Sequence, residues 1–134
     1  MKYDELEVDQ CATVVKQLSG DDIDAFARAS GDHNPIHTDP VFAQTQGFAD
    51  RIAHGMLLAS WISALLAENL PGPGTVYLRQ ELEFRRAALP GDTLSVSVTV
   101  AEKRRRGRVR LDCLIQNQNQ EDVLRGLAEV IAPG

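Results

Sequence analysis

The sequence predicts an α+β fold in which a curved antiparallel sheet wraps round one long central helix. Residues 54–70 form the longest apolar segment, sufficient for about four and a half helical turns. Four segments that follow it are rich in strand-forming residues or alternate between apolar and polar ones. Because a small domain can surround one apolar helix only by wrapping a sheet round it, these observations together indicate the fold class.

The chain is long enough for one domain and too short for two conventional ones, which predicts a single domain over residues 1–134. Hydrophobic residues make up 43% of the chain and charged residues 25%, which is typical of an ordinary globular protein. The net charge of -5 argues against general nucleic-acid binding.

The amino-terminal part is expected to hold one strand and two helical segments. β-Branched residues favour a strand over residues 12–18. Ser19 then suits a helix N-cap, acidic residues follow in the first turn, and the helical pattern stops at Gly31. A shorter helical turn is expected over residues 41–46, because an Asp-Pro pair precedes it.

The helix over residues 54–70 is apolar on nearly every face and is therefore expected to be buried. After it, turns rich in glycine, proline and polar residues separate the strands of an expected antiparallel meander. The expected strands cover residues 76–84, 93–102, 109–116 and 123–131.

Cys11 and Cys113 are the only cysteines, and they do not form a CxxC pair. They are expected to be reduced thiols in the core rather than a disulfide or a metal site. The sequence has no amino-terminal secretion signal and no apolar run of about 18 residues, so a cytoplasmic protein outside the membrane is expected.

The segment Gly31–His37 carries the residues best suited to acid/base chemistry. Asp32 and His37 are five positions apart, and a helix would place their side chains about 140° apart, on different faces. Pro35 cannot form the intra-helical hydrogen bond, so the backbone is expected to be non-helical and the two side chains to face each other across a turn. Burial under the apolar helix is expected to desolvate Asp32, which suits a general base, while His37 suits the second proton transfer.

Each of these residues can also have an ordinary structural role. Asp32 alone would more often bond its own turn, and His37 alone would more often be an ordinary surface or core histidine. Asn34 is expected to hold Asp32 or to close the turn through its amide. His37 and Asp39 could bind a metal in principle, but with three histidines and no HExxH or CxxC pair no metal site is predicted.

Gly55 falls at the start of the apolar helix, where unpaired N–H groups and the positive end of the helix dipole can stabilise a carbonyl oxygen that gains negative charge. Its missing side chain leaves room for a substrate, or simply for tight helix packing. His54 is expected either to cap this helix or to border the site, and the sequence does not choose between the two.

Several stretches resemble one enzyme family. Residues 26–37, which read FARASGDHNPIH, and Ala43 six residues further on are similar to the signature of the hydratase 2 or MaoC-like family, the (R)-specific enoyl-CoA hydratases. The resemblance continues through AHGML at residues 53–57 and LPGD at residues 89–92. One position departs from the signature, because Ala29 stands where the family has a larger aliphatic residue or glycine.

The resemblance implies a hot-dog fold and reversible syn hydration of a trans-2-enoyl-CoA to an (R)-3-hydroxyacyl-CoA. In this family the activity often links fatty-acid oxidation to polyhydroxyalkanoate synthesis. With the family motif, Asp32 is expected to be the general base toward water, His37 the second catalytic residue, and Gly55 the contact to the thioester oxygen. No metal or redox cofactor is expected, since coenzyme A is part of the substrate.

Contacts with an acyl-CoA are predicted along one face of the helix and at basic residues. The residues expected to border an acyl tunnel are Met56, Ser60, Ser63 and Leu66, with Trp61 as a further wall. The two serines more often hydrogen-bond their own helix. Arg85 and Arg86, or the basic run at residues 103–108, could meet the phosphates of coenzyme A.

A homodimer is predicted, because one sheet wrapped round one helix leaves an edge strand and an apolar flank exposed, and hot-dog domains commonly join their sheets edge to edge. No nucleic-acid or membrane partner is expected. Three alternatives to the hydratase stay open: a dehydratase that acts on acyl-carrier-protein substrates, an acyl-CoA thioesterase, and a non-catalytic acyl-binding module.

Overall fold

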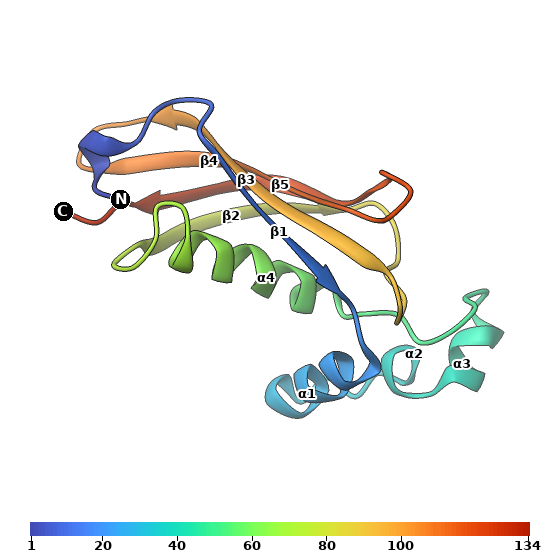
Figure 1. Cartoon of the computed structure of the whole chain (residues 1–134). Coiled ribbons are helices and arrows are strands. Elements are labelled where there is room, and N and C mark those ends of the chain that lie inside the picture. The colour runs from blue at the N-terminus through green and yellow to red at the C-terminus, as the bar shows by residue number, and fades with distance from the viewer.

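The computed structural model covers residues 1–134 and shows a five-stranded antiparallel sheet with one long helix along one of its faces (Figure 1). The strands are β1 (Cys11–Gln17), β2 (Val76–Phe84), β3 (Thr93–Lys103), β4 (Arg108–Gln116) and β5 (Asp122–Ile131). The helices are α1 (Gly20–Ser30), α2 (Pro35–Thr38), α3 (Pro40–Thr45) and α4 (Gly55–Glu68), and a 3₁₀ turn, η1, covers Tyr3–Glu5. The α+β fold class predicted from the sequence is confirmed.

The strands lie in the order β1-β3-β4-β5-β2, and every neighbouring pair is antiparallel. β3, β4 and β5 form a meander as predicted, but β2 pairs with β5 at the far edge of the sheet and not with β3. The connection over residues 85–92 is too long for a tight hairpin, and β1 occupies the other edge of β3. The prediction of one continuous four-stranded meander was therefore wrong for β2.

The core lies between the sheet and α4. Alternate residues of β3 and β4 are buried, as their period-two patterns predicted. The helix contributes the buried side chains of Leu57, Leu58, Trp61, Ile62, Leu65 and Leu66. These residues belong to a single cluster of 25 buried residues, so one contiguous core joins helix and sheet.

The opposite face of α4 is open in the single chain. Met56 is 60% exposed, and Ser60 and Ala67 are exposed as well. The prediction that nearly every face of this helix is buried was wrong, because the sheet covers only one side of it. Beside the open face lies β2, where Tyr77 and Phe84 are exposed aromatic side chains. No helix of the structure, α4 included, is both long and apolar enough to cross a membrane.

Helices α1, α2 and α3 gather at one end of the sheet (Figure 1). Ser19 and Asp22 cap α1 reciprocally: Ser19 Oγ accepts from the Asp22 N–H at 3.1 Å, and Asp22 Oδ2 accepts from the Ser19 N–H at 3.0 Å. Gly31 ends the helix with a φ of 77°, a conformation that glycine adopts without strain. Both ends of α1 therefore agree with the prediction.

The backbone over Gly31–His37 departs from the prediction that it is non-helical. A helical turn, α2, begins at Pro35, and Asn34 is its N-cap. Proline suits the first position of a helix, because the N–H that it lacks would have no partner there. The prediction therefore holds before Pro35 and was wrong after it.

The two cysteines are free and differ in burial. Cys113 on β4 is a core residue, and burial raises the pKa of its thiol to about 11. Cys11 is exposed on the edge strand β1. The prediction of two core thiols was therefore wrong for Cys11.

Candidate active site

Asp32 lies in the short segment between α1 and α2. Its Oδ1 accepts a hydrogen bond from the backbone N–H of Asn34 at 3.2 Å, and its own N–H donates to Ser30 Oγ at 3.1 Å. The side-chain oxygen of Asn34 accepts from the Ile36 N–H at 3.1 Å. Asn34 thus closes the turn with its side chain, as one predicted role required, and it holds Asp32 with its backbone rather than with its amide.

The ring of His37 is fixed by a backbone carbonyl. Its Nδ1 lies 2.8 Å from the carbonyl oxygen of Ile52. Because a carbonyl oxygen only accepts hydrogen bonds, Nδ1 carries the proton, and Nε2 is left available for proton transfer. Arg51 contacts α2, the helix that carries His37. Its Nη1 lies 3.4 Å from the His37 carbonyl oxygen and 2.6 Å from Asp24 Oδ1 on α1.

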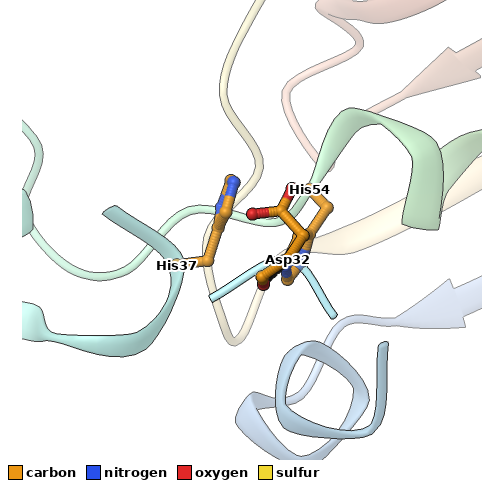
Figure 2. Close-up of side chains that lie close together, drawn as sticks. All are labelled: Asp32, His37 and His54. Atoms are coloured by element: carbon orange, nitrogen blue, oxygen red, sulfur yellow. Dashed lines mark hydrogen bonds between the residues drawn. The ribbon is translucent and has the colours of Figure 1, made fainter. Parts of the chain in front are cut away.

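Asp32 and His37 come together with His54 beside them (Figure 2). One carboxylate oxygen of Asp32 and one ring nitrogen of each histidine all lie within 4.8 Å of one another. A water molecule of suitable orientation can therefore contact both Asp32 and His37. Asp32 is exposed in the single chain, so the predicted desolvation of its carboxylate is absent there.

His54 immediately precedes α4 and is 2% exposed. Its Nε2 lies 3.0 Å from the backbone carbonyl oxygen of Asp32, and its ring stacks on that of His37 with centroids 3.9 Å apart. Its side chain makes no capping hydrogen bond to α4. Of the two roles left open by the sequence, His54 therefore borders the site and does not cap the helix.

Gly55 is the first residue of α4, and its N–H makes no hydrogen bond within the chain. The N–H of Met56 is likewise unpaired, as expected for the first turn of a helix. Gly55 lines the same groove as His37. An unpaired donor at the positive end of a helix dipole, beside an acid/base pair, is suited to an oxygen that gains negative charge.

Two apolar grooves meet at the start of α4. The first, of about 510 Å³, is lined by His37, Gly55 and both Arg85 and Arg86, among others. The second, of about 710 Å³, runs along the open face of α4 and is lined by Ser60, Ser63 and Tyr77, among others. Both grooves are bordered by Met56 and Phe84, so they adjoin there.

The predicted substrate-binding residues of α4 differ in access. Met56, Ser60 and Ser63 line the second groove, and Ser60 Oγ also donates to the Leu57 carbonyl, the back-bonding role expected for a helical serine. Leu66 is 1% exposed and belongs to the core against the sheet. The prediction that Leu66 borders an acyl tunnel was therefore wrong, because it lies on the other face of the helix.

The basic residues fall into two separate places. Arg85 and Arg86 border the first groove; Arg85 pairs with Glu83, and Arg86 Nη2 lies 3.0 Å from Glu121 Oε2. The run at residues 103–108 lies at the other end of β3, an 11-residue strand that spans about 35 Å. Only the first pair is therefore beside the acid/base residues.

Asp32, His37 and His54 are also the one cluster whose donor types could hold a metal ion. The two imidazoles are stacked with planes 24° apart, so their in-plane lone pairs run side by side and do not converge on one point. His37 Nδ1 and His54 Nε2 are in addition bound to backbone carbonyls. This geometry suits acid/base chemistry better than metal coordination.

Sequence reasoning missed three contributors to the site. Arg51 ties α2 to α1, Ile52 supplies the carbonyl that orients His37, and the Phe26 ring lies 4.9 Å from that of His54. Arg51 and Ile52 lie in a stretch without periodicity, and a backbone carbonyl carries no side-chain signal. Phe26 lies within the resembling motif, but its helical spacing indicated only core packing.

The sequence is similar to known enzymes over most of its length. The family model described as MaoC like domain matches residues 6–118. A 3-hydroxybutyryl-CoA dehydratase of Methylorubrum extorquens is 42% identical over 134 residues, which cover 98% of this chain and 83% of that protein. An (R)-specific enoyl-CoA hydratase of Aeromonas caviae is 44% identical over 104 residues, which cover 78% of each.

Solved structures agree with these sequence matches. The R-hydratase PhaJ1 of Pseudomonas aeruginosa, in its unliganded form, superposes with a TM-score of 0.94 and 46% identity over 98% of this chain and 85% of that one. An (R)-hydratase of A. caviae involved in PHA biosynthesis superposes with a TM-score of 0.92 and 40% identity over 96% of this chain and 98% of that one. The predicted resemblance is confirmed: the chain belongs to the MaoC-like domain family and has the hot-dog fold of the R-hydratases.

Proposed function

We propose that this protein is a lyase that adds water to trans-2-enoyl-CoA thioesters and forms (R)-3-hydroxyacyl-CoA, in a reversible reaction. The observation that carries the proposal is the meeting of Asp32 and His37 within 4.8 Å beside the unpaired N–H of Gly55. The names of the relatives, a hydratase and a dehydratase of acyl-CoA substrates, describe the two directions of this reaction.

In the proposed hydration, Asp32 and His37 hold one water molecule between them. The Asp32 carboxylate takes a proton from the water as its oxygen attacks C3, and His37 delivers a proton from Nε2 to C2. Because Nδ1 is already bonded to Ile52, His37 starts this step with protons on both ring nitrogens. The Gly55 N–H stabilises the enolate-like thioester oxygen, and proton exchange between Asp32 and His37 restores the starting state.

The acyl-CoA is proposed to lie across both grooves. The thioester would sit at Gly55, the acyl chain would follow the open face of α4 past Met56, and Arg85 and Arg86 would meet the phosphates of coenzyme A. The chemistry uses no metal or redox cofactor, and coenzyme A enters as part of the substrate. We also propose that the product serves polyhydroxyalkanoate synthesis, by analogy with the A. caviae hydratase.

The chain is proposed to act as one hydratase domain over residues 1–134 and as a homodimer. β2 is an edge strand and carries exposed apolar side chains at Val76, Tyr77, Leu78 and Phe84, next to the open face of α4. Edge-to-edge pairing through β2 would cover these residues and shield the grooves from water. Light scattering tests this part: a stable 14.7 kDa monomer at micromolar concentration would contradict it. The cytoplasmic location stays a prediction.

Loss of the enoyl absorbance after addition of crotonyl-CoA, with the chirality of the product measured, tests the reaction. We expect (R)-3-hydroxybutyryl-CoA and no release of free thiol. Free thiol would identify a thioesterase, reaction only with acyl-carrier-protein substrates would identify the alternative dehydratase, and binding without turnover would identify an acyl-binding module.

A further inference from the structure

We infer that His54 is a positioning residue, which holds Asp32 and His37 in the arrangement that proton transfer requires. This inference rests on the proposed function and goes beyond it, because His54 touches no reacting atom in the proposed mechanism. Its Nε2 bonds the backbone carbonyl of Asp32 at 3.0 Å, and its ring stacks on His37 at 3.9 Å between centroids. One side chain thus contacts both members of the acid/base pair.

The two contacts control different degrees of freedom. The hydrogen bond to the Asp32 carbonyl holds the peptide plane that follows Asp32, and so helps to place the nearby Asn34 N–H, which donates to the Asp32 carboxylate. The stacking contact fixes the plane of the His37 ring, whose remaining rotation is set by the bond from Nδ1 to Ile52. Together they help to determine where the carboxylate oxygen and His37 Nε2 point.

The setting of His54 argues against simple core packing. The ring is 2% exposed and also lies against Phe26 at 4.9 Å, so its own position is well defined. Its Nδ1 is buried without a hydrogen-bond partner, which costs stability that a purely apolar ring would not cost. If the ring served packing alone, the buried Nδ1 would be a cost without a benefit. The Nε2–H of the same ring, however, makes a specific hydrogen bond to the Asp32 carbonyl.

The hydrogen bonds place a proton on opposite ring nitrogens of the two stacked histidines. The Asp32 carbonyl only accepts, so His54 carries a proton on Nε2; the Ile52 carbonyl only accepts, so His37 carries a proton on Nδ1. Long-range ¹H–¹⁵N correlation spectra of the wild-type protein report these proton positions without any substrate. We expect a proton on Nε2 of His54, and on Nδ1 of His37 whether or not its Nε2 is also protonated; a His54 ring protonated on Nδ1 alone would overturn the inference.

Three variants separate the contacts in the active protein. In His54→Gln the amide nitrogen reaches the place of imidazole Nε2, whereas in His54→Asn the same amide reaches only the place of Nδ1. His54→Phe keeps a flat ring against His37 and has no donor. The glutamine and asparagine variants are matched in chemistry and differ by one methylene group, so they test the position of the donor.

We expect kcat for crotonyl-CoA hydration to fall about 10²-fold in His54→Asn and His54→Phe, the loss typical of a small misplacement of catalytic groups, and less than about tenfold in His54→Gln. KM should change less than about threefold in all three. Equal kcat values for the asparagine and glutamine variants, a kcat near wild type in all three, or an effect on KM alone would overturn the inference. If the variants do not fold, the position of the proton on the His54 ring of the wild-type protein still tests the inference.

The proposed function and the positioning role can fail separately. A wild-type protein that hydrates no enoyl-CoA contradicts the proposed function, and the position of the proton on the His54 ring still tests the contact of His54 with Asp32. Conversely, normal wild-type hydration with His54→Asn as active as wild type contradicts only the positioning role.

Discussion

The backbone of Gly55 lies directly against the ring of Phe84: a β-carbon at position 55 would lie 2.5 Å from Phe84 Cε1 and 2.9 Å from Cζ. Phe84 is 51% exposed in the single chain, and the atoms that approach position 55 belong to the end of its side chain, which can turn away from a larger neighbour. A substitution at Gly55 should therefore disturb the space for the thioester more than the fold.

Gly55→Val is expected to lower kcat by about 10² to 10³-fold, the usual loss when one donor to an oxyanion is removed or blocked. The melting temperature should fall only moderately, because the residue begins a helix and its new neighbour is movable. Phe84→Ala in the Gly55→Val background is the control, since it removes the collision. Recovered activity in this double variant, an unfolded Gly55→Val protein, or a fully active one would each contradict the oxyanion role.

Replacing both Arg85 and Arg86 with glutamine should raise KM for crotonyl-CoA about fivefold and leave kcat nearly unchanged. The two guanidinium groups are exposed at the rim of the first groove, where a phosphate contact stabilises ground state and transition state equally. Replacing Arg105 and Arg106 with glutamine removes the same charge from the far end of β3 and should change neither constant. Steady-state kinetics of both double variants at one ionic strength test this prediction. An equal change in KM in the two would contradict a local contact of Arg85 and Arg86 with the phosphates.

Cys113 should be far less reactive than Cys11 toward a thiol-reactive dye at pH 8. Burial raises the pKa of the Cys113 thiol from its ordinary 9.0 to about 11, whereas Cys11 is exposed. We expect one fast-reacting thiol in the folded protein and two after denaturation. Two fast-reacting thiols in the folded state would show that Cys113 is accessible.

The same raised pKa predicts the direction of a pH effect on stability. The unfolded chain loses the Cys113 proton near pH 9.0 and the folded chain only near pH 11, so the free energy of unfolding should fall as pH rises through this interval. Cys113→Ala should reduce this dependence. Melting temperatures of both proteins at pH 8 and pH 10 test it, and an identical change in both would contradict it.

Local sequence signals predicted most elements of the fold. The reciprocal cap of Ser19 and Asp22 and the left-handed Gly31 act within a few residues, so their effect on α1 is readable from sequence. Alternation over β3 and β4 predicted the strands and their buried faces for the same reason. Pro35 shows the limit of such rules, because proline both breaks a helix interior and begins a helix.

Contacts between distant segments could not be predicted in this way. The pairing of β2 with β5, the burial of Leu66 and the partners of His54 depend on how elements pack, and no local period encodes them. In the site, the sequence motif placed Asp32 and His37 close together. It did not reveal that two residues of a separate segment orient them: the Ile52 carbonyl bonds the His37 ring, and His54 bonds the Asp32 backbone.

Asp32 and His37 should behave as one unit in a double-mutant cycle. If both act on the same water, removal of either disables the same step, so Asp32→Asn combined with His37→Ala should cost little more in kcat than the worse single change. The three variants are compared in one crotonyl-CoA assay. Multiplying effects would indicate that the two residues act independently.

The most direct test of the account is crotonyl-CoA hydration by Asp32→Asn, measured together with thermal unfolding. Asparagine keeps the size of the side chain and an oxygen that can accept from the Asn34 N–H, but it lacks the carboxylate needed to activate water. We predict a folded protein whose kcat is lower by about 10² to 10⁴-fold. A stable Asp32→Asn protein with near wild-type turnover would contradict the assignment of Asp32 as the general base.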